Sequence, residues 1–357
     1  MDALVINPVS ARWQRRIGTA VLGIVMFASG MALSGCSNSG DGATAETAPL
    51  TVYSARNEQL IGPILAQFTE QTGITTALVT ADAGPLLERL KAEGDNTPAD
   101  ILITVDAGNL WQAAAADLLL PLDSAPLRTN VPAHLRDPDN RWFGLSIRAR
   151  TLVHHTGRAP ADTLGSYVDL ADPRFKGRLC LRTSRKVYNQ SLVGMLIAEY
   201  GEERTETIVR GWVANLAAPP FPNDTAVMEA IQAGLCDVGI VNTYYFGRLQ
   251  RAAADPALAL YWPDQDGSGV HVNVAGAGVV RGSDQPGRAQ ALIEWLSAPE
   301  AQSQFAGINL EYPVHPDVDP VAEVARWGTF RQNLINVSEA GERQPQAVKL
   351  MDRAGYR

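Results

Sequence analysis

The sequence has few cysteines and histidines, and it lacks the short motifs of several common site classes. It holds 3 cysteines and 5 histidines in 357 residues, with no Cys-x-x-Cys or other zinc spacing, so no structural zinc site is expected. No Gly-x-Gly-x-x-Gly opens a helix and no Gly-Lys-Ser/Thr follows a strand pattern, which argues against nucleotide binding. No Gly-x-Ser-x-Gly, His-Glu-x-x-His or Cys/His nucleophile pair is present, so we do not expect an enzyme.

A basic net charge is also absent. The formal charge is −8, and residues 1–35 hold three arginines and one aspartate, so the remainder carries −8 − 2 = −10. Nucleic acid would require a basic face and is therefore not an expected partner. Only one apolar run, near the N-terminus, approaches the length that spans a membrane.

That N-terminal segment has the layout of a signal peptide. A basic stretch precedes an uncharged run at residues 17–32, and a Leu-Ser-Gly-Cys box that resembles the bacterial lipoprotein cleavage box ends at Cys36. A membrane-spanning helix is the alternative, but the small residues before Cys36 favour processing. We predict a signal peptide at 1–35, lipid attachment at Cys36 and a flexible tether at 36–49. The mature protein would face the periplasm and touch the membrane only through this lipid.

The other two cysteines are Cys180 and Cys236. A compartment outside the cytoplasm is oxidising, which favours a disulfide between them. Tyr188 follows Cys180 by eight residues, and Tyr244 follows Cys236 by eight. A bridge between neighbouring strands would hold these two tyrosine segments in register. Two buried free thiols are the alternative.

From residue 50 onward, apolar runs alternate with amphipathic segments, as is typical of an α/β fold with a mostly parallel sheet. We expect strands at 50–54, 74–80, 100–105, 178–183, 236–242 and 270–280, and helices at 57–73, 85–94, 109–117, 189–200, 203–216, 224–234, 245–254 and within 285–305. The order of the segments predicts two lobes joined by hinge strands near 142–152 and 270–280. The first lobe would comprise 50–147 plus 273–357, the second 148–272, and the ligand would bind between them.

Tyr244 and Tyr245 lie where the strand pattern ending at Asn242 gives way to a helix, with Asn242 or Thr243 as the expected N-cap. A helix N-terminus carries partial positive charge and free N–H groups. This setting is expected to favour phenolate over phenol, and two phenolates on one loop would suit a hard trivalent cation. The alternative is an aromatic pair that packs in a crevice or stacks on an organic ligand.

Taken together, the segments resemble the periplasmic ferric-iron-binding proteins of ABC importers, which have a type II solute-binding fold. The most specific elements are Tyr188-Asn-Gln-Ser-Leu192 and Asn242-Thr-Tyr-Tyr-Phe-Gly-Arg248. The other similar stretches are 52–56, 98–106, 142–150, 311–314 and 327–330. The resemblance extends over roughly residues 50–330 and implies a monomeric, two-lobed α/β binding protein with hinge strands and an interlobe cleft.

The resemblance implies that Tyr188, Tyr244 and Tyr245 ligate Fe³⁺, which the protein delivers to an ABC permease in the inner membrane. Phenolate is a hard oxygen donor that suits this ion, and three phenolates balance its charge formally, +3 − 3 = 0. The open coordination positions would take carbonate, citrate or another small anion.

Three arginines, Arg56, Arg148 and Arg150, are the candidates to hold that anion, because guanidinium groups bind carboxylates bidentately. Many family members carry a His or a His-Tyr pair after the first strand, whereas this chain has Asn57-Glu58 there. Glu58 is therefore a candidate extra ligand, with a surface position as the alternative. Tyr53, on the first strand, is expected to line the cleft wall or to add a ligand.

A second function fits the same fold. The chain could bind an organic or oxyanionic solute, such as a polyamine, thiamine or a sugar phosphate, with the tyrosines stacking on it or hydrogen-bonding to it. Colour distinguishes the two functions, because a ferric–phenolate complex absorbs visible light and an organic complex does not.

Overall fold

The computed structural model describes residues 48–252 and 257–357. These residues belong to one compact unit. The predicted signal peptide and Cys36 lie outside the described residues, as does most of the tether, and they stay predictions. None of the helices in the described ranges combines the length and the apolar character that a bilayer crossing requires.

The strands of the described residues form a sheet with the order β2-β1-β3-β8-β4-β6-β5, and β7 and β9 each pair with β4. Their bounds are β1 Leu50–Ser54, β2 Thr76–Thr80, β3 Ile101–Thr104, β4 Phe143–His155, β5 Leu179–Cys180, β6 Val238–Asn242, β7 Leu258–Tyr261, β8 Val272–Val279 and β9 Tyr312–Pro313.

The sheet is mixed. β1 pairs in parallel with β2 and β3, and β5 pairs in parallel with β6. The pairs β3–β8, β4–β8, β4–β6, β4–β7 and β4–β9 are antiparallel. The expectation of a mostly parallel sheet is therefore wrong for its centre, because the chain leaves the first strands along β4 and returns along β8 in the opposite direction.

Helices cover the sheet in the order that the amphipathic pattern predicts. Their bounds are α1 Glu58–Thr72, α2 Ala83–Glu93, α3 Ala107–Ala115, α4 Ala125–Asn130, α5 Val187–Tyr200, α6 Glu202–Asn215, α7 Asp224–Gln232, α8 Thr243–Ala252, α9 Pro286–Ser297, α10 Pro299–Ile308, α11 Ala322–Ala325, α12 Ser338–Glu342 and α13 Gln344–Arg353. Short 3₁₀ turns lie at Gly94–Asn96, Ala133–Leu135, Ala161–Thr163, Asp169–Ala171 and Pro173–Phe175.

Helix α1 shows why these segments fold locally. The Asn57 side chain accepts a hydrogen bond from the backbone N–H of Gln59 and caps the first turn. Gly73 ends the helix with φ 72°, a left-handed conformation that glycine adopts without steric cost. Ile64 and Phe68 lie one turn apart and are both buried, so the helix packs through one apolar stripe.

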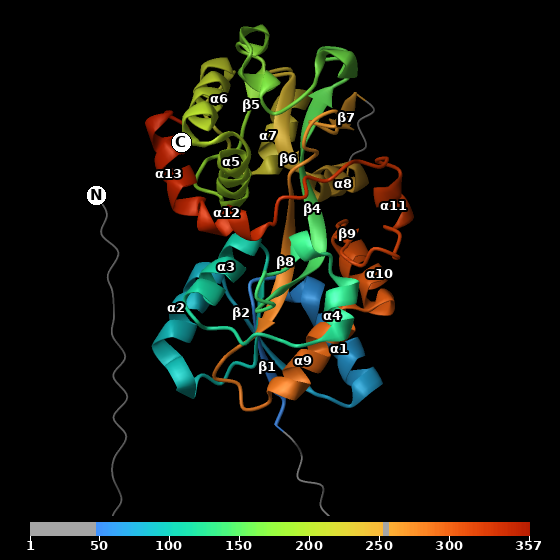
Figure 1. The fold of residues 1–357 in the computed structure, drawn as a ribbon. Helices are drawn as coiled ribbons and strands as arrows, with labels where there is room; N and C mark the ends of the chain where they lie inside the picture. The colour runs from blue at the N-terminus through green and yellow to red at the C-terminus, as the bar shows by residue number, and fades with distance from the viewer. Residues whose placement is uncertain (1–47, 253–256) are drawn as a thin grey trace, which may run out of the picture. The chain divides into compact units, whose positions relative to one another are not determined.

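Strand β4 is thirteen residues long and belongs to both ends of the sheet. Residues 143–149 pair with β8, and residues 150–154 pair with β6. We call β1, β2, β3, β8, β9 and the first half of β4 the first sheet, and β5, β6, β7 and the second half of β4 the second sheet. Figure 1 shows β4 and β8 side by side where the two sheets meet. These are the strands predicted near 142–152 and 270–280.

The C-terminal helix packs beside the second sheet. Ala347, Leu350 and Met351 of α13 are buried in one cluster with Leu192 and Ile197 of α5. The predicted lobe boundaries had placed this segment with the first lobe. The packing differs from that assignment because the buried face of α13 lies against α5.

The short helix α12 lies between α3 and α5, as Figure 1 also shows. Small residues allow this close approach. A Cβ atom on Gly341 would lie 2.6 Å from Cβ of Trp111 and 3.0 Å from Cα of Gly108, and one on Gly194 would lie 3.2 Å from the Ala340 carbonyl oxygen. The C-terminal segment therefore contacts helices from both sheets.

Candidate metal centre

The three predicted tyrosines lie in the first turns of two helices. Tyr188 is the second residue of α5, and Tyr244 and Tyr245 are the second and third residues of α8. Both helices begin two residues earlier than the sequence pattern predicts. Each helix N-terminus presents free N–H groups and partial positive charge, so two such ends point at one small region.

The structure brings all three tyrosines together. Tyr188 and Tyr244 lie close enough for each phenol to shift the pKa of the other. The rings of Tyr244 and Tyr245 lie 4.4 Å apart between centroids. Tyr188 and Tyr244 are buried, with 8% and 4% of their surface exposed, whereas Tyr245 is only half-buried. The three tyrosine rings, which come from two separate helices, therefore form one cluster.

Burial raises the pKa of Tyr188 and raises that of Tyr244 well above the ordinary phenol value. Arg148 lowers both values but does not offset the loss of water. The expectation that the helix ends favour phenolate is therefore wrong for these two tyrosines of the metal-free protein. Because desolvation outweighs the attraction of Arg148, an added cation is needed to displace their protons.

Cationic side chains surround the tyrosine rings. The guanidinium carbon of Arg148 lies 5.7 Å from the Tyr188 ring centroid. Arg182 lies 5.4 Å from the ring of Tyr188 and 5.8 Å from that of Tyr245. Two further cations face the rings at 5.1 to 5.9 Å, namely Lys186 and Arg248. The site is therefore electropositive before any metal enters.

Arg148 and Arg56 share a buried carboxylate. The Arg56 Nη2 atom lies 2.9 Å from Oε2 of Glu311, and the Arg148 Nη1 atom lies 3.7 Å from Oε1. Ser146 donates a further hydrogen bond of 2.6 Å to Glu311. Burial alone would raise the pKa of Glu311, but the two arginines more than offset it, so the pKa is lowered. Two nitrogens of each arginine still have no partner: Nε and Nη1 of Arg56, and Nε and Nη2 of Arg148.

Arg150, the third predicted anion holder, is occupied by protein groups. Its Nη1 atom lies 2.7 Å from Asp224 and 3.3 Å from the Asn242 side-chain oxygen, and its Nη2 atom lies 2.5 Å from that of Asn189. Asn189 follows Tyr188 directly, and Asn242 is the last residue before α8. Arg150 therefore ties the starts of the two tyrosine helices to β4.

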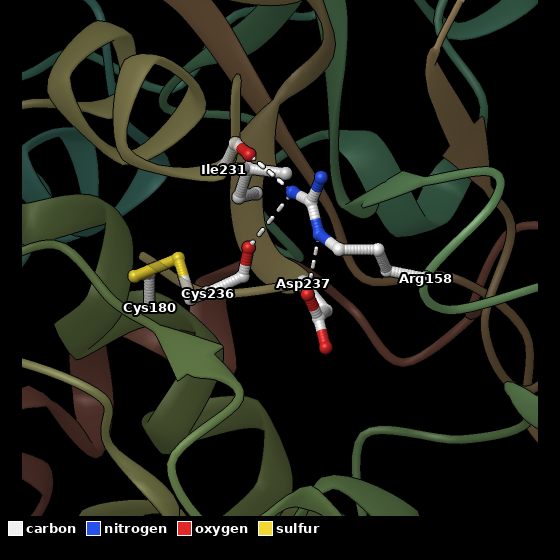
Figure 2. Close-up of a disulfide and its surroundings, with 5 residues drawn as sticks. All are labelled: Arg158, Cys180, Ile231, Cys236 and Asp237. Carbon is white, nitrogen blue, oxygen red and sulfur yellow. Dashed lines mark hydrogen bonds and ion pairs between the residues drawn. A yellow bond between two sulfur atoms is a disulfide. The ribbon is translucent and has the colours of Figure 1, made fainter. Parts of the chain in front are cut away.

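A disulfide joins Cys180 and Cys236, as predicted. Cys180 ends β5, and Cys236 lies two residues before β6. Figure 2 shows that Arg158 supports this bridge, donating to the carbonyl groups of Cys236 and Ile231 and pairing with Asp237 at 2.7 Å. Because β5 leads to α5 and β6 leads to α8, the bridge ties together the two strands that precede the tyrosine helices.

Tyr53 and Glu58 have other surroundings. The Tyr53 hydroxyl donates to Glu93 at 3.0 Å, and Arg89 lies over its ring at 4.6 Å. Glu58 is exposed and lines a pocket of about 1010 Å³ beside Arg56 and the end of β2. The contacts found for these two side chains do not include the three tyrosines, and their roles stay predictions.

In the part of the chain that the structure describes, the three tyrosines gather phenol groups near these helix starts. In the ranges 48–252 and 257–357, no group of three or more His, Cys, Asp or Glu side chains is placed to hold a metal ion. Neutral or anionic oxygen donors without sulfur or imidazole favour a hard cation.

Sequence reasoning missed three residues beside the tyrosines: Arg182, Asp224 and Glu311. Asp224 is fully buried and accepts hydrogen bonds from Arg150 and from the backbone N–H of Asn242. A weak signal existed for Arg182, because it lies two residues after Cys180 and so on the same side of an extended chain. Asp224 and Glu311 carried no local signal, since their partners lie far away in the sequence.

Comparisons with known proteins identify the family of this chain. The family model of the bacterial extracellular solute-binding proteins matches residues 96–329. Iron uptake protein A1 of Synechocystis sp. is 39% identical over 99% of this chain and 100% of its own length.

Two solved structures share the fold. Trichodesmium IdiA (FutA), in complex with iron and citrate ligands, has a TM-score of 0.84 at 38% identity and covers 87% of this chain and 100% of its own. A ferric iron-binding protein A of Mannheimia haemolytica in an open conformation has a TM-score of 0.80 at 37% identity, covering 86% of this chain and 98% of its own. These matches confirm the predicted two-lobed α/β fold and the resemblance stated above. The chain belongs to the family of bacterial extracellular solute-binding proteins.

Proposed function

We propose that this protein captures ferric iron outside the cytoplasm and delivers it to an ABC permease, with Tyr188, Tyr244 and Tyr245 as ligands. The observation that supports this most is the meeting of three phenol groups from the first turns of α5 and α8. The names of the relatives point the same way, since they are iron-uptake and ferric iron-binding proteins.

The energetics of the site select a highly charged ion. Phenolates buried without a counter-charge are costly, which is why the pKa values of Tyr188 and Tyr244 are raised in the metal-free protein. Fe³⁺ balances three phenolates, so its entry removes that cost, whereas a monovalent or divalent cation leaves negative charge uncompensated. The surrounding arginines then disfavour further cations and attract an anion to the remaining coordination positions.

Arg148, assisted by Arg56, holds that anion. Both arginines keep two unpartnered buried nitrogens each, and Arg148 also lies against the Tyr188 ring. Arg150 ties the two helix starts together and does not bind the anion, because its two terminal nitrogens already have protein partners. Citrate fits the chemistry of the site, and the Trichodesmium relative was solved with iron and citrate.

Capture proceeds by closure about β4 and β8, the strands where the two sheets meet. The tyrosines belong to α5 and α8, so iron loads on that side first. Side chains from the other side then close over it. Asp106, at the start of α3, accepts a hydrogen bond of 3.1 Å from Ser191 on α5. This contact ties the first-sheet side to the tyrosine helix.

The remaining assignments follow from the same function. A lipid on Cys36 holds the monomeric protein at the periplasmic face of the envelope, where it meets the permease. The relatives are binding and transport proteins, and this chain has no catalytic role. Glu58 is a candidate contact on the first-sheet side of the cleft.

The test is the visible spectrum of the purified protein with ferric citrate. A phenolate-to-iron charge-transfer band is expected, and Tyr188→Phe, Tyr244→Phe and Tyr245→Phe should each weaken it and speed iron loss. Tyr200→Phe is the matched control, since Tyr200 ends the same helix α5 far from the cluster. A band that survives all three site variants would refute the assignment, and the absence of any band in the wild type would favour an organic solute.

A further inference from the structure

Arg182 lies at the base of the tyrosine cluster, in the short segment between the disulfide and α5. It is buried, with 5% of its surface exposed. Its carbonyl oxygen accepts hydrogen bonds from the Asn189 side chain at 2.8 Å and from the Tyr356 hydroxyl at 2.6 Å. A bridge to Phe221 fixes the backbone on its other side. The main chain at Arg182 is therefore held from several directions.

The Arg182 guanidinium group has one anchor and two aromatic neighbours. Nη1 lies 3.4 Å from the Asp224 carboxylate, which is fully buried. The guanidinium carbon faces the Tyr188 ring at 5.4 Å and the Tyr245 ring at 5.8 Å. Nε has no partner. The planar fork thus lies between a fixed carboxylate and two of the three candidate ligands.

The neighbouring cations make a different set of ring contacts. Among the described residues, Arg148 and Lys186 face the Tyr188 ring, and Arg248 faces the rings of Tyr244 and Tyr245, which share one helix. In the described part of the chain, Arg182 is the cation that faces rings from both α5 and α8. It can therefore fix the spacing between the two helices at the level of the rings.

Tyr245 is the ligand that most needs such support. Tyr188 and Tyr244 are buried, whereas Tyr245 is half-buried. A partly exposed ring can leave its position unless a neighbour holds it, and each immobilised rotamer costs entropy at the time of binding. The Arg182 guanidinium group, which is itself anchored to Asp224, can hold the ring in place before the metal binds, so that less entropy is lost on binding.

We propose that Arg182 is a positioning residue of the metal site, which holds the Tyr245 phenol in register with Tyr188 so that both oxygens meet one ion. The inference rests on the proposed function, because it assumes that these tyrosines bind iron. Arg182 does not touch the ion. It acts by keeping the third ligand from swinging away, and so it governs how slowly iron leaves.

The test compares iron release and the charge-transfer band in four proteins: wild type, Arg182→Gln, Arg182→Lys and Arg204→Met. Glutamine keeps a donor toward Asp224 but has no charge and no fork. Arg204 lies over the Tyr200 ring at 5.1 Å on the exposed surface, so its variant removes a similar arginine–tyrosine contact away from the site. Each protein is loaded with ferric citrate and then challenged with an excess of a stronger chelator.

We expect Arg182→Gln to release iron at least tenfold faster than wild type, with a weaker and shifted band, while Arg204→Met matches wild type. Arg182→Lys should lie between them, at least threefold faster, because one ammonium cannot replace a fork at a stacked site. The inference would be overturned if Arg182→Gln kept an iron-release rate and a charge-transfer band intensity within twofold of wild type. If the glutamine variant does not fold, the same result in Arg182→Lys would overturn it. Absence of any band in the wild type would instead overturn the proposed function.

Discussion

Removal of the Cys180–Cys236 bridge should destabilise the protein by an amount set by the loop that it closes. The perturbation is the double variant Cys180→Ala/Cys236→Ala, in which both sulfur atoms are lost. The two cysteines are 56 residues apart in the sequence and are buried. In the oxidised protein, this loop is closed in the unfolded chain as well, so the unfolded state has less entropy to gain.

The magnitude follows from the loop length. Closing a loop of 56 residues removes about 14 cal/mol/K of chain entropy, which is about 4 kcal/mol at 25 °C. Loss of two buried sulfur atoms adds roughly 1 kcal/mol each from lost packing. The free energy of unfolding should therefore fall by about 4 to 6 kcal/mol, a large share of the stability of an ordinary domain.

The assay is urea unfolding followed by circular dichroism, with single Cys→Ala variants to separate the packing loss from the loop effect. Each single variant loses the bridge and one sulfur, so the double variant should differ from it by only about 1 kcal/mol. A loss below 1 kcal/mol in the double variant would refute the loop argument. The same variants should bind iron more weakly, because β5 and β6 lead directly to the tyrosine helices.

Three further outcomes are expected. Three phenol protons must leave when iron binds, so the logarithm of the iron-binding constant should rise by about three for each pH unit, one for each tyrosine. Competition with a chelator of known protonation measures this dependence, and a slope near zero would contradict phenolate ligation. Burial raises the pKa of Asp106 to about 6, and the attraction of Arg148 together with the hydrogen bonds to Asp106 only partly offsets this rise. The stabilisation from protonated Asp106 is therefore complete below about pH 4 and is lost as the pH rises through 6. In urea titrations of the apo protein, Asp106→Asn should reduce the change in the free energy of unfolding between pH 4 and 7 by about 3 kcal/mol, and an unchanged pH dependence would contradict this account. Gly341→Ala should destabilise the folded protein by about 1–3 kcal/mol, because the added methyl group clashes with Trp111. Gly62→Ala, inside α1, places its methyl group where no atom lies within 4 Å and should stabilise the protein by about 0.5–1 kcal/mol. Thermal unfolding measures both effects, and equal effects at the two sites would refute the packing account.

Local pattern predicted most helices of this fold well. Apolar spacing located α1, α6 and α7 within about two residues, because each buries one stripe; in α1 and α7 an asparagine side chain also caps the first turn. Strand direction was not predictable in the same way. An isolated strand pattern has no polarity relative to its neighbours, so the antiparallel pairs made by β4 and β8 became visible only in the sheet.

The clustering of Tyr188, Tyr244 and Tyr245 was predictable, because each tyrosine lies where a strand pattern gives way to a helix pattern; their role as metal ligands stays a prediction. The side chains that organise this cluster were not predictable. Arg150 was predicted to hold the anion, but both of its terminal nitrogens are hydrogen-bonded to Asp224, Asn189 and Asn242. Those partners come from three different elements. The sequence around Arg150 does not indicate which distant residues will form hydrogen bonds with its guanidinium group.

The shortest helices were also missed. α12 has five residues and packs by means of glycine and alanine, so it shows no amphipathic stripe. Its position between α3 and α5 depends on the absence of side chains, which a pattern of apolar residues cannot reveal.

The hydroxyl group of Tyr356 donates a hydrogen bond to the backbone carbonyl of Arg182, which is 174 residues away in the sequence. It also accepts a hydrogen bond from the side chain of Asn189, which is 167 residues away. Contacts at such separations form slowly, because a long stretch of chain must lose entropy before the contact contributes any stabilising energy. The ability to colour with iron should consequently emerge late when the unfolded protein is diluted from denaturant, after the far-ultraviolet signal has recovered. A fragment that stops short of residue 356 should regain its helices and still bind the metal poorly.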